Sequence, residues 1–154
     1  MTTDELTNIL SLALSRAIGT RRTNESVELK FDVQGDEIPI APGAIHHLVC
    51  IGQEAVTNAL RHAEASAINI QVRYESELLS LVIRDNGRGF QPSDTRFRFG
   101  HFGIPVMEER SRKLGGTLRV TSSEAGTEVV MTVGFHKIHQ LNNQQHHVVQ
   151  WIGV

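Results

Sequence analysis

A helical repeat between positions 44 and 63 constrains the fold more than any other feature of this chain. Glu54, Asn58 and His62 recur at every fourth position, so on a helix they form one polar stripe. Beside it runs an apolar stripe that consists of Ile51, Ala55 and Ala59. The segment is therefore expected to pack one face of a helix against a core and to keep polar ligands on a second face.

The polar stripe has the chemistry of a site for a metal-bound polyphosphate, because hard cations take oxygen ligands. The amide oxygen of Asn58 could coordinate Mg²⁺, and Glu54 could hold a metal-bound water or act as a general base. Arg61 and His62 are placed to face phosphates, although the solvated end of a helix would have the same residues.

A second motif, Asp85-Asn-Gly87-Arg-Gly89-Phe90, places a carboxylate before a glycine-rich turn. An ionised Asp85 only accepts hydrogen bonds, so it can accept from the amine of adenine and would repel the carbonyl of guanine. Gly87 and Gly89 would let the backbone approach the purine closely. An Asp-Asn-Gly hairpin turn without a ligand is the alternative. The polar stripe upstream favours the nucleotide site.

Hydrophobic periodicity predicts an α/β fold. Helices are predicted at 4–19, 44–63 and 104–114, with Gly19 ending the first, and alternation predicts strands at 27–33, 68–74, 79–83, 118–120 and 129–133. Neighbouring strands imply hairpins, and helices between strands imply a sheet with helices packed on one face.

The polar loop between residues 86 and 103 is long enough to be functional. Gly100 and Gly103 could act as hinges, and Gly103 precedes a helix whose N-terminus would attract an anion. Arg96 and Arg98 could reach phosphates or remain solvated. We expect this loop to cover a bound nucleotide. Farther along, Thr127 could bring its hydroxyl near Asp85 and the adenine.

Composition predicts one soluble, cytoplasmic domain. The chain has 154 residues, a net charge of −2 and one cysteine. A single cysteine excludes an internal disulfide, and the net charge argues against a strongly basic nucleic-acid binder. It has no signal peptide and no stretch of about 20 apolar residues that would span a membrane. Residues 136–154 hold four of the eight histidines and predict a polar tail, with a loosely spaced metal site as the alternative.

These motifs, taken in order, resemble the catalytic ATP-binding domain of bacterial sensor histidine kinases, within the superfamily of gyrase and heat-shock chaperone ATPases. Residues 54–62 resemble its asparagine box and residues 85–90 its first glycine box. Residues 100–103 resemble the second glycine box, and Gly126-Thr127 resembles the last, with fewer glycines than many relatives have. Residues 103–116 resemble the subfamily whose partners are response regulators with helix-turn-helix domains.

The resemblance implies a two-layer α/β sandwich with a mixed, mostly antiparallel sheet, helices on one face and a mobile ATP lid. It implies Mg-ATP as the bound nucleotide. The site it implies consists of Glu54, Asn58, Arg61, His62, Asp85, Gly87, Gly89, Gly100, Gly103 and Thr127. It divides the chain into an N-terminal helix (1–24), the catalytic domain (25–135) and the tail (136–154).

The resemblance also implies partners. A sensor kinase presents the γ-phosphate to a histidine on a dimerising helical hairpin, and no histidine precedes His46 here. We therefore expect an excised domain that binds ATP but cannot phosphorylate itself alone. The full kinase is expected to be a homodimer that signals to a response regulator, and either a cytoplasmic protein or a membrane-bound sensor with this domain in the cytoplasm. Two alternatives stay open: a stand-alone serine kinase similar to anti-sigma factors, and a nucleotide-sensing module without catalysis.

Overall fold

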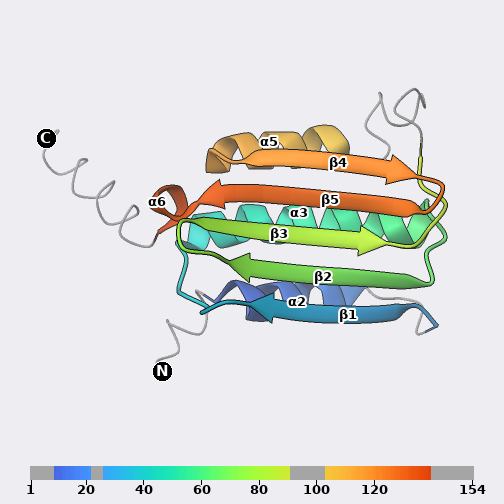
Figure 1. The fold of residues 1–154 in the computed structure, drawn as a ribbon, viewed down its shortest axis with the longest axis horizontal. Coiled ribbons are helices and arrows are strands. Elements are labelled where there is room, and N and C mark those ends of the chain that lie inside the picture. Colours follow the sequence, from blue (N-terminus) through green and yellow to red (C-terminus); the bar gives the residue numbers. More distant parts are fainter. Residues whose placement is uncertain (1–8, 22–25, 91–102, 140–154) are drawn as a thin grey trace, which may run out of the picture.

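The computed structural model describes residues 9–21, 26–90 and 103–139 (Figure 1). Residues 91–102 of the expected lid, with Gly100, Arg96 and Arg98, lie outside the described residues, as does most of the expected tail. The elements are α2 (Leu10–Arg21), β1 (Glu28–Gln34), α3 (Pro42–Arg61), β2 (Ala67–Tyr74), β3 (Leu78–Asp85), α5 (Ile104–Leu114), β4 (Thr117–Ser123), β5 (Gly126–Gly134) and α6 (Phe135–Ile138).

Five strands form one sheet in the order β1-β2-β3-β5-β4. The predicted hairpins β2–β3 and β4–β5 are antiparallel, and β3 also pairs antiparallel with β5. β1 runs parallel to β2, because α3 carries the chain back between them. The structure confirms the mixed, mostly antiparallel sheet that was expected.

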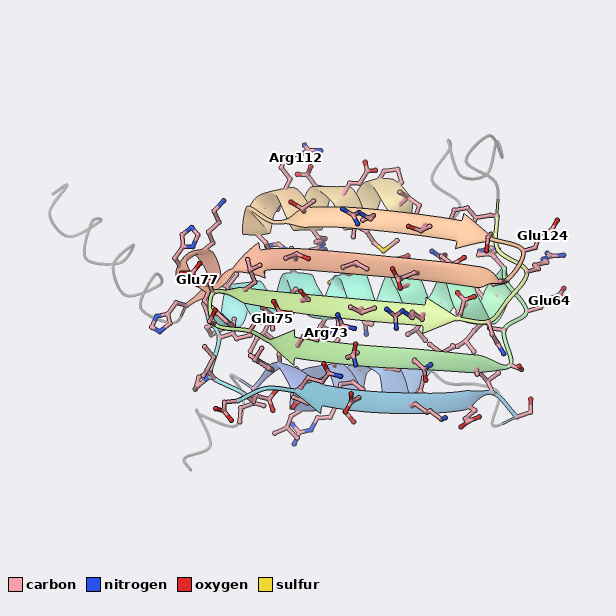
Figure 2. The ribbon with its side chains drawn as sticks, viewed as in Figure 1. Glu64, Arg73, Glu75, Glu77, Arg112 and Glu124 are labelled. Carbon is pink, nitrogen blue, oxygen red and sulfur yellow. The ribbon has the colours of Figure 1, made fainter. Side chains whose placement is uncertain are left out.

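Helices α2, α3 and α5 cover one face of the sheet (Figure 1). The apolar stripe of α3 is buried between them and the strands, with Ile51 at 0% exposure and Ala55 at 4%. The opposite face carries polar side chains, such as Arg73, that point away from the helices (Figure 2). This two-layer arrangement is what alternating strands produce when only one face is buried.

Helix α2 packs on α3 through Leu10, Leu14 and Ile18, which belong to the core shared with the sheet. The prediction that Gly19 ends this helix is wrong, since α2 continues to Arg21. Gly19 is exposed with no atom near the position of a side chain. A solvent-facing glycine weakens a helix by only about 1 kcal/mol relative to alanine, which packing can offset. None of the described helices is long and apolar enough to cross a membrane.

Candidate nucleotide site

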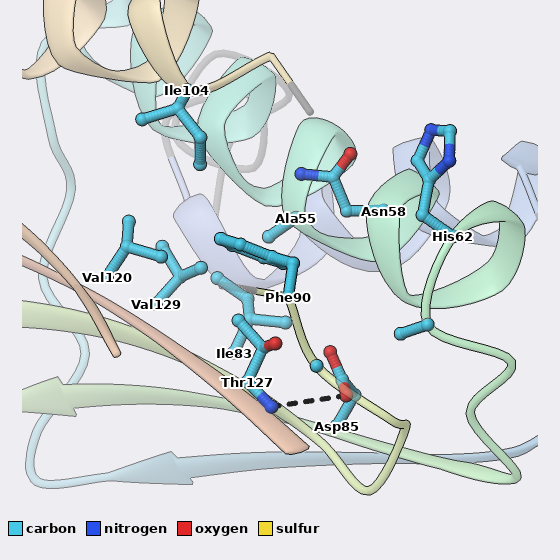
Figure 3. A pocket seen from close by; sticks show the side chains of 12 residues that line it. Ala55, Asn58, His62, Ile83, Asp85, Phe90, Ile104, Val120, Thr127 and Val129 are labelled. Atoms are coloured by element: carbon cyan, nitrogen blue, oxygen red, sulfur yellow. Dashed lines mark hydrogen bonds between the residues drawn. The ribbon is translucent and has the colours of Figure 1, made fainter. Parts of the chain in front are cut away.

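A pocket opens between α3, the N-terminal end of α5 and strands β3, β4 and β5 (Figure 3). Its lining residues are Ala55, Asn58, His62, Ala63, Ile83, Asp85, Gly89, Phe90, Ile104, Val120, Thr127 and Val129. The wall is mostly apolar and the few polar groups converge, which is the usual composition of a small-molecule site.

Asp85, the last residue of β3, is the acidic group of this pocket. Its Oδ1 accepts hydrogen bonds from the backbone N–H of Gly87 at 2.8 Å and of Thr127 at 3.3 Å. Burial raises the pKa of Asp85, and the two backbone hydrogen bonds oppose that rise. Within the described residues Oδ2 takes part in no hydrogen bond, so it is available to accept one from a ligand.

The glycines after Asp85 are needed for close packing of backbone against backbone. A side chain at Gly87 would clash with the carbonyl of Ala63, the same oxygen that accepts the N–H of Arg88 at 2.8 Å. Gly89 has a φ of 70° and lies against the carbonyl of Ser123. The turn is thus held between the end of α3 and β4, and Asp85 is fixed at its start.

Asn86 anchors the same turn from the opposite side, and sequence reasoning gave it no role. Its Oδ1 accepts the backbone N–H groups of Ser66 and Ala67, both at 2.9 Å, and its Nδ2 donates to the hydroxyl of Ser66. The sequence could have indicated this role, because an asparagine side chain commonly bonds to backbone groups at turns.

The polar stripe of α3 reaches the pocket in part. Asn58, 9% exposed, and half-buried His62 both line it. Arg61 is exposed and lies outside the lining, because it occupies a different face of α3. Glu54 is also absent from the lining. Its carboxylate lies at the start of α5, where any side chain at position 103 would clash with it.

Gly103 precedes α5 as expected and adopts a left-handed conformation with a φ of 65°. The next residue, Ile104, contributes to the pocket wall. The structure therefore places the N-terminal end of α5 against both the pocket and Glu54.

Phe90 and Ser122 also belong to the site, although sequence reasoning assigned them no function. The ring of Phe90 lies between Ala55 and the β5 residues Thr127 and Val129 (Figure 3). The hydroxyl of Ser122 accepts the N–H of Phe90 at 2.8 Å and shares a 2.8 Å hydrogen bond with the hydroxyl of Thr127. Phe90 could have been identified from the sequence, because it directly follows the glycine motif. Ser122 could not, because a serine in a strand has no recognisable sequence signature.

The described residues contain no group of three or more His, Cys, Asp and Glu side chains suited to a metal ion. A magnesium ion bound with a nucleotide needs only one or two protein ligands, since phosphate oxygens and waters supply the others. The buried amide of Asn58, with a carboxylate one turn earlier at Glu54, is a donor set of that kind.

Comparisons with known proteins agree with this geometry. The family model described as histidine kinase-, DNA gyrase B- and HSP90-like ATPase matches residues 43–137. The sensor histidine kinase LiaS of Bacillus subtilis (strain 168) is 30% identical over 125 residues, which cover 80% of this chain and 34% of LiaS. The nitrate/nitrite sensor protein NarX of Escherichia coli (strain K12) is 38% identical over 87 residues, covering 56% of this chain and 14% of NarX.

Among solved structures, the histidine kinase domain of the Erythrobacter litoralis EL346 blue-light activated histidine kinase matches with a TM-score of 0.64. The two sequences are 26% identical, and the match covers 81% of this chain and 60% of that one. The chain thus spans about a third of LiaS and a smaller part of NarX.

Proposed function

Because the chain belongs to the family of histidine kinase-, DNA gyrase B- and HSP90-like ATPases, we propose that it is the Mg-ATP-binding catalytic domain of a two-component sensor histidine kinase. The observation that carries this proposal is the Asp85 carboxylate, which is held by two backbone N–H groups and keeps one oxygen available inside an apolar pocket. Such a group accepts a hydrogen bond from the adenine amine and disfavours guanine.

The phosphates would extend from the adenine toward α3. Asn58 would hold Mg²⁺ through its amide oxygen, and His62 would face the phosphates from the same stripe. When bound, the metal neutralises charge on the phosphate oxygens during transfer. Glu54 would act as the general base and second metal-side ligand. Gly103 places the start of α5 against the Glu54 carboxylate, which supports that position.

The γ-phosphate would be transferred to a histidine on a separate helical hairpin of the same kinase, so catalysis here rests on positioning and electrostatics. The full protein would be a homodimer with its kinase part in the cytoplasm. A response regulator with a helix-turn-helix domain would receive the phosphoryl group. Support comes from residues 103–116, whose sequence resembles the subfamily with such partners.

Calorimetry on the chain tests the site assignment. Asp85→Asn should weaken ATP binding by about 10- to 100-fold or more, since a hydrogen bond to a charged group contributes about 1.5–3 kcal/mol. The matched control is Asp32→Asn on the polar face of the sheet, where Asp32 bonds to Gln34 and Gln71. Wild-type affinity in Asp85→Asn would exclude the proposed adenine contact.

Asn58→Ala should weaken binding in Mg²⁺ and change little in EDTA, because the lost group is a metal ligand. Asn69→Ala, an exposed asparagine on β2, is the control. Equal losses with and without Mg²⁺ would contradict the metal role of Asn58.

The acceptor is tested by supplying candidate substrates with radiolabelled ATP. A helical hairpin from a related sensor kinase should acquire a phosphoryl group that is labile in acid and stable in base. An acid-stable label on a small protein substrate would instead indicate a serine kinase.

A further inference from the structure

Ser122 connects two parts of the pocket that are distant in sequence. Its hydroxyl accepts the backbone N–H of Phe90, at the end of the glycine turn, and bonds to the hydroxyl of Thr127 on β5. We propose that Ser122 is a positioning residue that donates its proton to Thr127 Oγ1 and so turns the Thr127 proton toward N1 of the adenine. This inference rests on the proposed function, since it specifies how the same site reads the base.

Either hydroxyl can donate in the Ser122–Thr127 hydrogen bond, and we take Ser122 as the donor because that direction leaves the Thr127 proton for a ligand. A serine hydroxyl has one proton to donate and two lone pairs to accept with. The Phe90 N–H occupies one lone pair of Ser122. Within the described residues, Ser122 Oγ bonds only to Phe90 and Thr127, so Thr127 is the protein acceptor for its proton.

Thr127 then keeps its own proton for a ligand. Its Oγ1 bonds only to Ser122 within the described residues, and the residue is 8% exposed while lining the pocket. Donation by Ser122 leaves the Thr127 proton without a protein acceptor there. A buried hydroxyl proton that lacks an acceptor is unfavourable, so a ligand acceptor at this position is stabilised.

Adenine presents the matching pair of groups. Its N6 amine donates, and the adjacent ring nitrogen N1 accepts. Asp85 and Thr127 are direct cross-strand partners in the β3–β5 ladder, and the Thr127 N–H donates to the Asp85 carboxylate (Figure 3). In the proposed arrangement N6 donates to Asp85, and N1 would face the hydroxyl of the adjacent Thr127. Hypoxanthine and guanine carry a proton on N1 and would meet the Thr127 proton instead.

The competing explanation is that Ser122 only ties β4 to the glycine turn. The analogue 1-deaza-ATP separates the two roles, because it keeps the N6 amine and replaces N1 by a C–H group. If Ser122 only connects β4 to the turn, its substitution should change the affinities for ATP and 1-deaza-ATP equally. If Ser122 orients the Thr127 proton, its substitution should lower the affinity for ATP alone.

The experiment measures the affinities of the chain for Mg-ATP and Mg-1-deaza-ATP and takes their ratio. Wild-type protein should prefer ATP by about tenfold, the contribution of one hydrogen bond. In Ser122→Ala the preference should fall to about twofold or less. Ser123→Ala is the matched control, because this neighbouring serine is exposed and, among the described residues, its hydroxyl accepts only the N–H of Ala125, at 3.1 Å. It should keep the wild-type ratio.

Thr127→Val should remove the preference, and adding Ser122→Ala to it should leave the ratio unchanged, since Ser122 acts through Thr127. If Ser122→Ala does not fold, Ser122→Cys provides a thiol of similar size that is a weak donor, and the preference should fall there as well. A melting curve for each variant identifies the ones that fold.

Three results would overturn the inference: no ATP preference in the wild type, an unchanged ratio in Ser122→Ala, or a further change of ratio on combining the two substitutions. Its failure is separable from that of the proposed function. If ATP binds and Asp85→Asn weakens binding as expected while Ser122→Ala keeps the ratio, only the role of Ser122 is excluded. If wild-type protein binds no ATP, the proposed function fails.

Discussion

Burial of the Asp85 carboxyl has opposite consequences for nucleotide binding and for folding. The proposed adenine contact requires the ionised form, because only that form accepts from the adenine amine without donating a proton. Folding favours the neutral form, since burial raises the pKa of Asp85 above its ordinary value of 3.8. The residue that we propose to recognise adenine therefore lowers the stability of the fold at neutral pH.

Asp85→Asn should make the protein more stable at pH 7 while weakening ATP binding. Below pH 3.8 the carboxyl is protonated in both the folded and the unfolded state, so the two proteins should differ least there. Between 3.8 and the raised folded pKa only the unfolded state ionises, and the stability of the wild type relative to the variant falls. Above that pKa the difference is constant. Urea unfolding of both proteins from pH 3 to 8 measures the difference in their free energies of unfolding. A variant less stable than wild type at pH 7 would contradict the expectation.

Gly87→Ala should destabilise the fold by about 1–3 kcal/mol, the usual range for forcing extra atoms into a packed region. The added carbon would meet the carbonyl of Ala63, and the hydrogen bond from the Arg88 N–H to that carbonyl would have to shift. Gly43→Ala is the control, because nothing lies near its side-chain position. Chemical denaturation compares the three proteins, and equal stability of Gly87→Ala and Gly43→Ala would show that the turn can move away from α3.

Site residues could be predicted from the sequence where their role depends on neighbouring residues in the chain. Asp85 followed by an asparagine and two glycines is a recognisable turn, and the turn lies where it was expected. Ser122 could not be predicted, because its two partners come from a separate turn and a separate strand that only the folded sheet brings together. Arg61 lies outside the pocket lining because it is on an exposed face of α3, which the residue type does not reveal.

The close contact of α2 with α3 depends on Gly52, a glycine in the interior of α3. A side chain at this position would lie 2.9 Å from a methyl carbon of Leu14. The missing side chain lets the two helices approach, and Leu14 fills the space with no exposed surface. Helix α2 is thus held by the apolar packing of Leu10, Leu14 and Ile18.

Leu14→Ala should reduce the free energy of unfolding by about 2–5 kcal/mol, because it leaves a cavity in the α2–α3 contact. Leu12, on the same helix and 36% exposed, provides the matched control. Leu12→Ala should change stability by less than about 0.5 kcal/mol. Thermal or urea unfolding measures both, and equal effects would mean that α2 contributes little to the core.

Element types could be predicted because periodicity is a local property, but the pairing of β1 could not. β1 joins β2 in parallel across the whole length of α3, so its partner is 39 residues away, as in the pair Glu28 and Ala67. The sequence of β1 itself contains no information on that partner. The end of α2 was mispredicted because packing on α3 overrides the weak helix propensity of Gly19.

For the whole molecule, ATP should act as a stabilising ligand of this chain without any other domain. At a concentration of 100 times Kd, a ligand that binds only the folded state adds about 2.7 kcal/mol, which raises Tm by about 5–10 °C in a protein of this size. Thermal scans with Mg-ATP should show this shift, while Mg-GTP and the variant Asp85→Asn should give a clearly smaller one. An equal shift with GTP would exclude adenine recognition by Asp85.

The pocket lies at one end of the sheet, and α6 and the start of α2 lie at the other end. The pair Asp85 and Thr127 is at the pocket end, and the pair Leu78 and Gly134 is at the other, beside α6 and the start of α2 (Figure 1). There the backbone N–H of Ala41 bonds to Ile138, and Glu37 accepts from Ser11. An anchor or fluorophore attached just before α2 or just after α6 would therefore sit far from the bound base. Protein immobilised on a sensor surface at that end would present its pocket to the flowing solution.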